Sequence, residues 1–467
     1  MTVVKNERTL IDHFQRTLEH ILQINDIDLS DTGLAVAYSG GLDSSVLLDL
    51  AKVFCQRKKI PLFAFHVHHG LSPNADDWLL HCSKQCESMG ATFVGTKVVL
   101  ENVHKDGIEA SARDARYKSL GMLCSQYKLP LILTAHHQDD QAETVLLQLL
   151  RGSGVAGLSG MDQFNRAPRL LCNDSLLIAR PLLAITRQRM VEYTNDNVIA
   201  YVEDESNIDT RYVRNALRHQ LMPILSSIAP GYAERLSRSA MHAQSTNRLL
   251  TEIAKQDLHS CAADKEGLYI PSVIALGADR IDNLLRYWLA LKGSRMPTTA
   301  RLAELRHQLF EGREDAKISV YHDNLVIHRY KNRIYSSLRS AIKIADVVPR
   351  QFCWNGEALM AFPEFGGILH FDDADSGISA DWLKETMLTM HPRQGGERLK
   401  LASNRPTRDI KSHYQSMEIP FWERDRLPLI SCGKKLLFAA GIGSDAAFFD
   451  TLPNPLVRLR WEFIVNE

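Results

Sequence analysis

A short loop rich in glycine and serine holds the residue types that bind phosphate groups. It reads Ser39-Gly40-Gly41-Leu42-Asp43-Ser44 and lies between an apolar run and a second apolar stretch with helical spacing. A tight turn from a strand into a helix directs several backbone N–H groups and the positive end of the helix dipole toward one point. The glycines allow close backbone approach, and the serines add hydroxyl groups. The loop therefore predicts a phosphate site at residues 39–44.

Asp43 is the unusual member of this loop, because a carboxylate repels a polyphosphate. Its presence is explained if it holds a magnesium ion that the phosphates also contact. No lysine follows the glycines, so the loop is not a Walker A motif. The pattern S-G-G-x-D-S resembles the pyrophosphatase loop of the N-type ATP pyrophosphatases, which split ATP into AMP and pyrophosphate to activate a carbonyl. The alternative is an ordinary turn with a serine or aspartate as N-cap.

Asp140 and Glu143 form a second candidate group. They are three residues apart at the start of a predicted helix, so they share a face near the positive end of its dipole. Two carboxylates there suit magnesium or a cationic substrate. The alternative is helix capping by the acidic residues.

Histidine and arginine supply two further candidates. His66 lies in a histidine-rich stretch at a strand end, where it either lines the nucleotide site or is a structural histidine. The spacing fits no established zinc pattern. Arg113 and Arg116 share one helix face and could neutralise charge on a transferring phosphoryl group, or they are surface arginines.

Two basic regions are candidates for RNA contacts. Arg211, Arg214 and Arg218 have the i, i+3, i+7 spacing of one helix face. The stretch 393–411 holds six basic residues against two acidic ones, and its main candidates are Arg398, Arg408 and Lys411. We expect the last two to share a face of a helix near 408–418. The alternative in both regions is a solvated surface.

These residues need a scaffold, and the hydrophobic pattern supplies one. Apolar strand-like runs alternate with helical patterns, which predicts a parallel sheet covered on both faces. The strands are expected at 34–38, 61–66, 92–99 and 131–134, and the helices at 7–25, 43–57, 75–89, 108–127 and 140–151. Residues 39–44, His66 and residues 135–136 each follow a strand, so they should meet at the carboxyl edge of the sheet.

The rest of the chain reads differently. Residues 152–184 are rich in glycine and proline, about 186–310 are mainly helical, three short strands follow, and mixed α and β structure begins after 345. The predicted fold class is α/β, with a parallel-sheet catalytic domain at 1–218, a mainly helical middle domain at 219–345 and a small α+β domain at 346–467. The two later domains are expected to contact nucleic acid.

Composition limits the function classes. The chain has 467 residues with 55 basic and 55 acidic side chains, so nucleic-acid binding must come from local basic faces. Its eight cysteines include no C-x-x-C pair, and no apolar run has the length of a membrane span. We expect reduced thiols and a soluble cytoplasmic protein without membrane association.

With these motifs in place, nearly the whole chain resembles the bacterial tRNA(Ile)-lysidine synthetases. The matching blocks follow in the family's order at 39–44, 66–71, 136–143, 151–158, 205–218 and 395–398. The resemblance implies ligation of free L-lysine to the wobble cytidine of an isoleucine tRNA with a CAU anticodon, which changes codon reading from AUG to AUA. The cytosine carbonyl oxygen attacks the α-phosphate of ATP, and the lysine ε-amine then displaces AMP.

The resemblance also assigns roles. It implies that residues 39–44 and His66 bind ATP, that Asp43 carries magnesium, and that Asp140 and Glu143 hold lysine or assist its deprotonation. Arg113 or Arg116 would act at the α-phosphate, and the basic residues named above would contact tRNA.

Three rival interpretations remain. A tRNA thiolase typically needs a cysteine set that is missing here, and a glutamine-dependent synthetase needs a second catalytic domain. A nucleotide sensor or tRNA-binding protein without turnover would not need Asp43 or the acidic block at 139–143. The sequence leaves the oligomeric state open.

Overall fold

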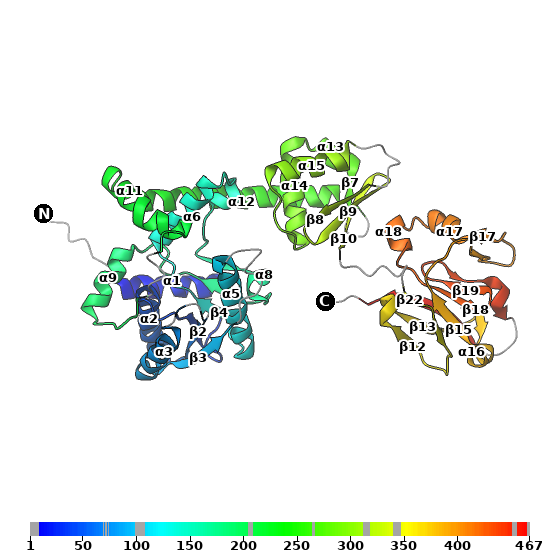
Figure 1. Ribbon diagram of the computed structural model, residues 1–467, viewed down its shortest axis with the longest axis horizontal. Coiled ribbons are helices and arrows are strands. Elements are labelled where there is room, and N and C mark those ends of the chain that lie inside the picture. The colour runs from blue at the N-terminus through cyan, green and yellow to red at the C-terminus, as the bar shows by residue number, and fades with distance from the viewer. Residues whose placement is uncertain are drawn as a thin grey trace. The chain divides into compact units, whose positions relative to one another are not determined.

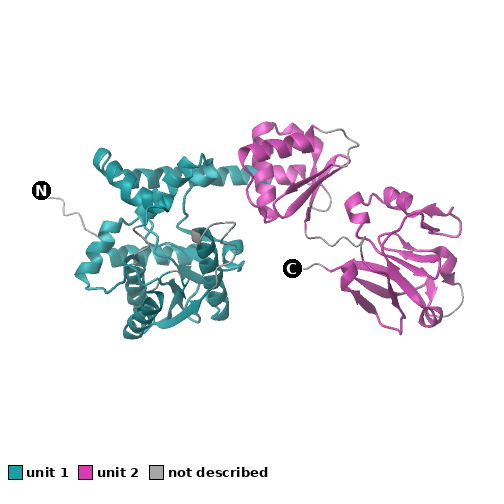
Figure 2. Cartoon of the chain, in the orientation of Figure 1, with its two compact units in different colours: residues 1–255 teal, residues 256–467 magenta. Residues whose placement is uncertain are grey.

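The computed structural model describes residues 9–68, 70, 72, 74–98, 108–203, 209–263, 267–311, 318–339, 347–450 and 455–464. The chain divides into two compact units, residues 1–255 and 256–467 (Figure 2). Each unit has its own sheets and its own hydrophobic core, and each is described by itself.

A six-stranded sheet organises the first unit, with the order β3-β2-β1-β4-β6-β5 (Figure 1). Its strands are β1 (Leu34–Ala37), β2 (Leu62–His68), β3 (Thr92–Lys97), β4 (Leu131–Leu133), β5 (Phe164–Arg166) and β6 (Leu177–Ala179). Five strands run parallel, and β5 pairs antiparallel with β6. The four predicted strands are present. The last two were missed because each has only three residues, in a segment whose glycines and prolines predicted irregular structure.

Helices cover both faces of this sheet. They are α1 (Leu10–Ile24), α2 (Leu42–Lys58), α3 (Ala75–Met89), α5 (Ile108–Gln126), α6 (Gln138–Leu150), α7 (Val155–Leu158), α8 (Pro168–Leu171) and α9 (Arg187–Asp196). Successive side chains of β1 alternate between two cores: Leu34 and Val36 pack with α1 and α2, whereas Ala35 packs with α5. Burial on both faces explains why the strands read as continuous apolar runs.

A helical segment follows the sheet. It consists of α10 (Val213–Ala216), a π-helical turn η2 (Leu217–Leu221), α11 (Met222–Ile228) and α12 (Tyr232–Cys261). Pro223 at the start of α11 accounts for the π-turn. Its ring lacks an N–H and would clash with the carbonyl four residues earlier, at His219, so the helix widens before it.

The second unit begins with helices packed on a four-stranded antiparallel sheet, β7-β10-β9-β8. The elements are β7 (Leu268–Tyr269), α13 (Ile270–Ala275), α14 (Ala278–Leu291), α15 (Thr299–Phe310), β8 (Ile318–His322), β9 (Leu325–Tyr330) and β10 (Arg333–Leu338). Trp288 of α14 is buried at the centre of this core. Three of the four strands were predicted, and β7, with two residues, was not.

Two five-stranded antiparallel sheets share one core in the remainder of the unit. The first holds β11 (Arg350–Phe352), β15 (Leu388–His391), β18 (Leu429–Cys432), β19 (Lys435–Ala439) and β20 (Gly443–Ser444). The second holds β12 (Leu359–Phe362), β13 (Gly367–Ala374), β22 (Leu456–Phe463), β14 (Gly377–Ser379) and β21 (Phe449–Asp450). A small sheet pairs β16 (Arg398–Leu399) with β17 (Arg408–Asp409), and the helices are α16 (Ala380–Glu385), α17 (Ile410–Ser416) and α18 (Phe421–Arg424). The mixed α and β structure expected after 345 is confirmed.

Candidate active site

The predicted phosphate loop connects β1 to α2, as expected. Gly40 adopts φ +87°, and a Cβ atom there would lie 2.7 Å from the Cys82 sulfur. Both conformation and space therefore require glycine at this position. Gly41 is the N-cap of α2 and has no side chain to cap it. The first-turn N–H groups of α2 consequently remain available to the oxygens of a ligand.

The two serines brace this loop instead of pointing both hydroxyls at a ligand. The Ser39 and Ser44 hydroxyls lie 3.0 Å apart, and the Ser44 hydroxyl also donates to the Gly41 carbonyl at 3.0 Å. The Ser39 N–H donates to the Ser44 hydroxyl at 3.2 Å. Ser44 is buried inside the turn in this structure, and the expectation that both hydroxyls donate to phosphate stays a prediction.

Asp43, in the first turn of α2, carries a buried carboxylate oxygen, Oδ1, that accepts no hydrogen bond. The Arg187 guanidinium lies 4.0 Å from this oxygen, beyond hydrogen-bond distance, so the oxygen still lacks a donor and the position fits a further cation. Magnesium typically takes one or two carboxylates and completes its shell with water and substrate phosphates. Within the described residues, no group of three or more histidine, cysteine, aspartate or glutamate side chains could hold a metal ion. Asp43 with nucleotide phosphates suits magnesium better than an all-protein cage.

His137 connects this loop to the acidic residues, and sequence reasoning did not single it out. It is the fully buried N-cap of α6, and its Nδ1 accepts from the Asp140 N–H at 3.3 Å. That bond leaves the proton on Nε2, which lies 3.6 Å from Asp43 and 3.4 Å from Asp140. Burial alone would lower the pKa of His137, but three carboxylates, Asp140, Asp43 and Asp139, outweigh it and raise the pKa.

Asp140 and Glu143 share one face of α6, as predicted, but two arginines cover them. Arg214 donates to Glu143 at 2.7 Å and to Asp140 at 3.1 Å. Arg218 donates to the same two carboxylates at 2.6 and 3.1 Å. We call these four residues the acid–arginine quartet.

The electrostatics of the quartet favour the charged forms. Burial would raise the pKa of Asp140, but His137, His136, Arg214 and Arg218 outweigh it and lower the pKa to about 2. Burial likewise lowers the pKa of Arg218, but Glu143 and Asp140 raise it above its usual value. Glu143 is fully buried. In this conformation a lysine ammonium group can reach Glu143 only if the arginines move.

The expected face of three arginines is therefore wrong. Arg214 and Arg218 point at the acids, although they do share a helix side. Arg211 precedes α10, is 89% exposed and pairs with Asp209 at 2.6 Å. The spacing was right for two of the three residues, but nothing in it revealed that buried carboxylates lie opposite.

The structure separates the two candidate arginines of α5. The guanidinium groups of Arg113 and Arg116 lie 5.1 and 5.3 Å from the Tyr117 ring centre. Arg113 is exposed, whereas Arg116 is half-buried. Burial and the nearby charges of Arg180, Arg116 and Arg214 hold the pKa of His136 near 3 despite Asp140. Of the two arginines, Arg116 is thus the one whose charge contributes to lowering the pKa of His136.

His66 supports the loop from below. It is buried, and its Nδ1 hydrogen-bonds the Tyr38 carbonyl at 3.0 Å, one residue before the loop. Burial lowers the pKa of His66, so the ring is neutral. This contact fits a structural role beside the nucleotide site. Residues 69 and 71 of the same motif, and 205–208 of another, lie outside the described residues.

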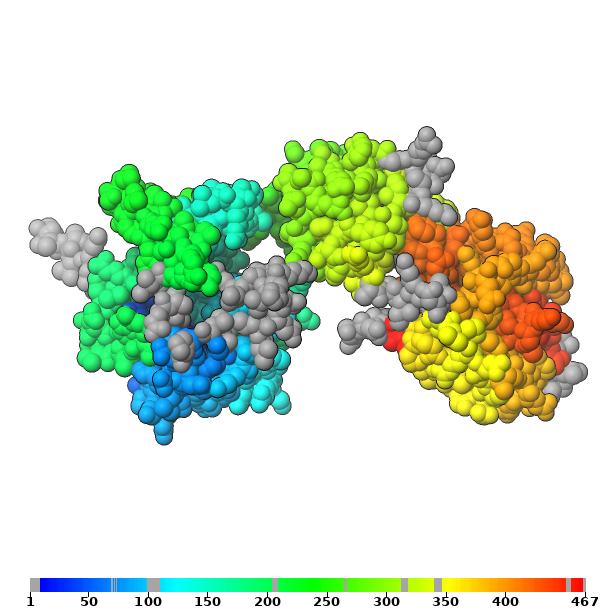
Figure 3. All heavy atoms as spheres, in the orientation of Figure 1, coloured from blue at the N-terminus to red at the C-terminus, as the bar shows by residue number. Residues whose placement is uncertain are grey.

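The basic stretch 393–411 lies on the second unit, whose orange segment near residue 400 is visible at the surface (Figure 3). Arg408 belongs to β17 and Lys411 to α17, so they do not share the helix face that we expected. The helix begins only at residue 410 because Asp409 caps it, accepting from the Ser412 N–H at 2.8 Å. A cavity of about 580 Å³ is lined by Gly396, Arg398, Thr407, Arg408, Asp409 and Ser412.

Comparison with known proteins covers most of the chain. Family models match residues 10–225 ("PP-loop domain"), 268–335 ("TilS substrate binding domain") and 388–461 ("TilS substrate C-terminal domain"). The tRNA(Ile)-lysidine synthase of Burkholderia pseudomallei is 36% identical over 92% of this chain and 93% of its own length. That of Coxiella burnetii is 36% identical over 91% and 92%. The solved structure of the U34-tRNA thiolase NcsA from Methanococcus maripaludis has a TM-score of 0.41 and 18% identity, over 50% of this chain and 78% of that one.

Proposed function

Because this chain belongs to the tRNA(Ile)-lysidine synthase family, we propose that the phosphate loop and the acid–arginine quartet form one catalytic centre. The protein is an ATP-dependent carbon–nitrogen ligase that joins L-lysine to the wobble cytidine of an isoleucine tRNA. One observation supports the single centre above all others: His137 Nε2 lies between Asp43 of the loop and Asp140 of the quartet. The groups for both half-reactions thus meet around one imidazole.

The loop serves the adenylation half-reaction. The α2 N-terminus, with residues 39–44 around it, binds the phosphates of ATP, and His66 holds the loop from beneath. Asp43 would hold magnesium, which when bound offsets the charge on departing pyrophosphate. The cytosine carbonyl oxygen bonds to the α-phosphorus as the bond to pyrophosphate breaks. Arg116 stabilises the added charge at the α-phosphate, and Arg113 contributes from farther away.

The acids serve the second half-reaction. Asp140 and Glu143 hold the ammonium groups of lysine, and one of these carboxylates accepts a proton from the ε-ammonium group. The neutral ε-amine then forms the bond to the activated carbon as the bond from that carbon to the AMP oxygen breaks. Arg214 and Arg218 occupy these acids now, so productive lysine binding requires that they swing away. A tRNA phosphate has the charge and geometry to bind Arg214 and Arg218 in place of the two carboxylates, since guanidinium groups bind phosphate in bidentate fashion. The two arginines would thus become tRNA contacts.

Remote tRNA contacts are proposed at Arg211 and at the cavity formed by Arg398, Arg408 and nearby Lys411. The three-domain division at residues 218 and 345 also stays a proposal, as does a cytoplasmic location. In the described ranges, no helix has both the length and the apolar character to cross a membrane.

The function is tested by incubating the protein with ATP, labelled lysine and an isoleucine tRNA transcript with a CAU anticodon. We expect labelled lysidine among the digested nucleosides and one AMP for each lysidine. A methionine tRNA with the same anticodon is the control and should remain unmodified. Sulfur incorporation, or tRNA binding without AMP release, would contradict the ligase and support the thiolase or the sensor.

A further inference from the structure

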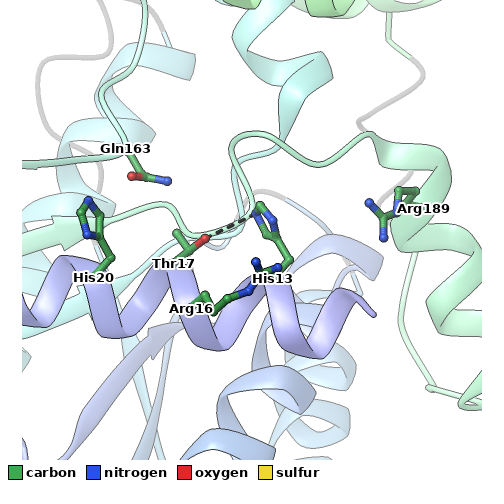
Figure 4. A pocket seen from close by; sticks show the side chains of 6 residues that line it. All are labelled: His13, Arg16, Thr17, His20, Gln163 and Arg189. Carbon is green, nitrogen blue, oxygen red and sulfur yellow. Dashed lines mark hydrogen bonds between the residues drawn. The ribbon is translucent and has the colours of Figure 1, made fainter. Parts of the chain in front are cut away.

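A cationic cavity lies outside the catalytic centre, in the first unit (Figure 4). It has a volume of about 400 Å³, within the range of small-ligand sites. Its wall is formed by His13, Arg16, Thr17, His20, Gln163 and Arg189. None of the roles assigned so far uses these residues.

The cavity exists because α1 has two different faces. Leu10, Phe14, Leu18 and Ile21 are buried against the sheet. His13, Arg16, Thr17 and His20 recur at the same helical spacing on another side, so they form a continuous polar stripe. Gln163, just before β5, and Arg189, in α9, face this stripe from across the cavity (Figure 4).

The wall is composed of hydrogen-bond donors and positive charge. Two guanidinium groups, two imidazoles, an amide and a hydroxyl face the cavity, and among the described residues no carboxylate lines it. Arg16 is anchored by its Nε, which donates to the Asp12 carbonyl at 3.0 Å. Burial lowers the pKa of His13, and the positive charges of Arg16 and Arg189 lower it further. Both guanidinium groups are thus close enough to His13 to disfavour its protonated form.

The cavity is connected to the catalytic centre through α9. Two residues before Arg189, the N–H of Arg187 donates to Asp139 at 2.8 Å, and the Arg187 guanidinium lies 4.0 Å from Asp43. An anion bound at the cavity would therefore contact the same short helix whose first residue touches the phosphate loop.

We propose that this cavity binds a phosphate group, with Arg16 and Arg189 as its charged clamp. Guanidinium forks match the tetrahedral oxygens of phosphate, and the half-buried Gln163 amide adds a donor, while the Thr17 hydroxyl lies 3.5 Å from His13 Nε2. The proposal rests on the tRNA substrate stated above, because the favoured source is a backbone phosphodiester of that tRNA. Free pyrophosphate, a product of the reaction, presents the same chemistry.

The test compares two double variants that remove the same charge from surfaces next to α1. The Arg16→Gln, Arg189→Gln double variant removes both guanidinium groups of the proposed phosphate site. Arg57→Gln with Lys58→Gln is the matched control: these side chains contact Gln15 at 2.7 Å and Glu19 at 2.9 Å, on the other flank of α1. Thermal melting confirms that both variants fold. Dissociation constants for the tRNA are measured at several salt concentrations, and inorganic pyrophosphate is titrated calorimetrically.

For the clamp variant we expect a tRNA dissociation constant raised by about 3- to 10-fold and a salt slope lowered by one to two units, with the control close to wild type. Loss of one pyrophosphate site in the clamp variant, with the phosphate-loop site retained and the tRNA affinity unchanged, would assign the cavity to the free anion. If neither ligand is affected, or if the control loses as much as the clamp, the cavity is no phosphate site. Failure of the proposed function would be seen separately, as a wild-type enzyme that forms no lysidine.

Discussion

The chain has two arginine clusters that were predicted to contact RNA, the first from helical spacing and the second from its local excess of positive charge. In the acid–arginine quartet, Arg214 and Arg218 each bind two carboxylates, one of them fully buried. On the second unit, Arg398 and Arg408 are exposed; Arg398 donates to the Thr407 carbonyl at 3.1 Å, and the only carboxylate among the described lining residues, Asp409, already caps α17.

The difference shows what helical spacing can report. It tells which side chains lie on the same side of an element, but it does not tell what faces them. A partner carboxylate more than 70 residues away in the chain converts a basic face into part of a catalytic centre. The predictions below test this contrast, beginning with the largest expected effect.

The loop carboxylate next to the quartet should matter most. We expect Asp43→Asn to lower AMP formation by at least about 10³-fold, because the magnesium-binding charge is lost. Its tRNA dissociation constant should stay within about twofold of wild type, since the remote basic cavity is intact. Normal AMP formation in this variant would remove Asp43 from the mechanism.

Breaking the quartet should also cost stability. Glu143→Gln should lower the free energy of unfolding by about 3–5 kcal/mol, because it removes the buried charge that faces two guanidinium groups. Arg398→Ala should change it by no more than about 0.5 kcal/mol, as expected for an exposed side chain. Urea denaturation measures both, and equal effects would remove the contrast between the clusters.

Acid should weaken the first cluster selectively. The pKa of Asp140 is about 2 in the fold, below its ordinary value of 3.8. Because the pKa is lowered in the fold, the ionised carboxylate adds about 2 kcal/mol to the free energy of unfolding above pH 3.8. This contribution is lost as the pH falls from 3.8 toward 2. Asp140→Asn should flatten the stability profile between these pH values. An unchanged profile would mean that Asp140 is not held in its ionised form.

The exposed cluster should affect only tRNA. Arg408→Ala with Lys411→Ala should raise the tRNA dissociation constant several-fold and lower the salt slope by about one to two units. The KM for ATP should not change, because the phosphate loop belongs to the other unit. If affinity and slope were both unchanged, this charge would be solvated surface.

Much of the catalytic scaffold could be predicted from the sequence. The strands that carry residues 39–44 and His66 are continuous apolar runs of four and seven residues, and such runs are readable without tertiary information. The role of His137 was not predicted, because it depends on two carboxylates brought together from α2 and α6. The serine brace inside the loop escaped prediction for the same reason. Arg408 was misplaced because the capping role of Asp409 sets the helix start two residues later than the charge pattern suggested.

The π-turn at Leu217–Leu221 has a consequence for chain length. A π-turn is an α-helix with one residue inserted, and in a regular α-helix one inserted residue rotates everything that follows by about 100°. Here the widened turn accommodates the extra residue between Arg214 and Pro223, so the helix axis continues without that rotation. A one-residue deletion inside the turn should therefore keep the direction of α11 but return the Pro223 ring to the clash that the widening relieves, whereas the same deletion within α12 would rotate its remaining turns. The extra residue is thus needed by the proline, and the widened turn that holds it includes Arg218 and follows Arg214 directly.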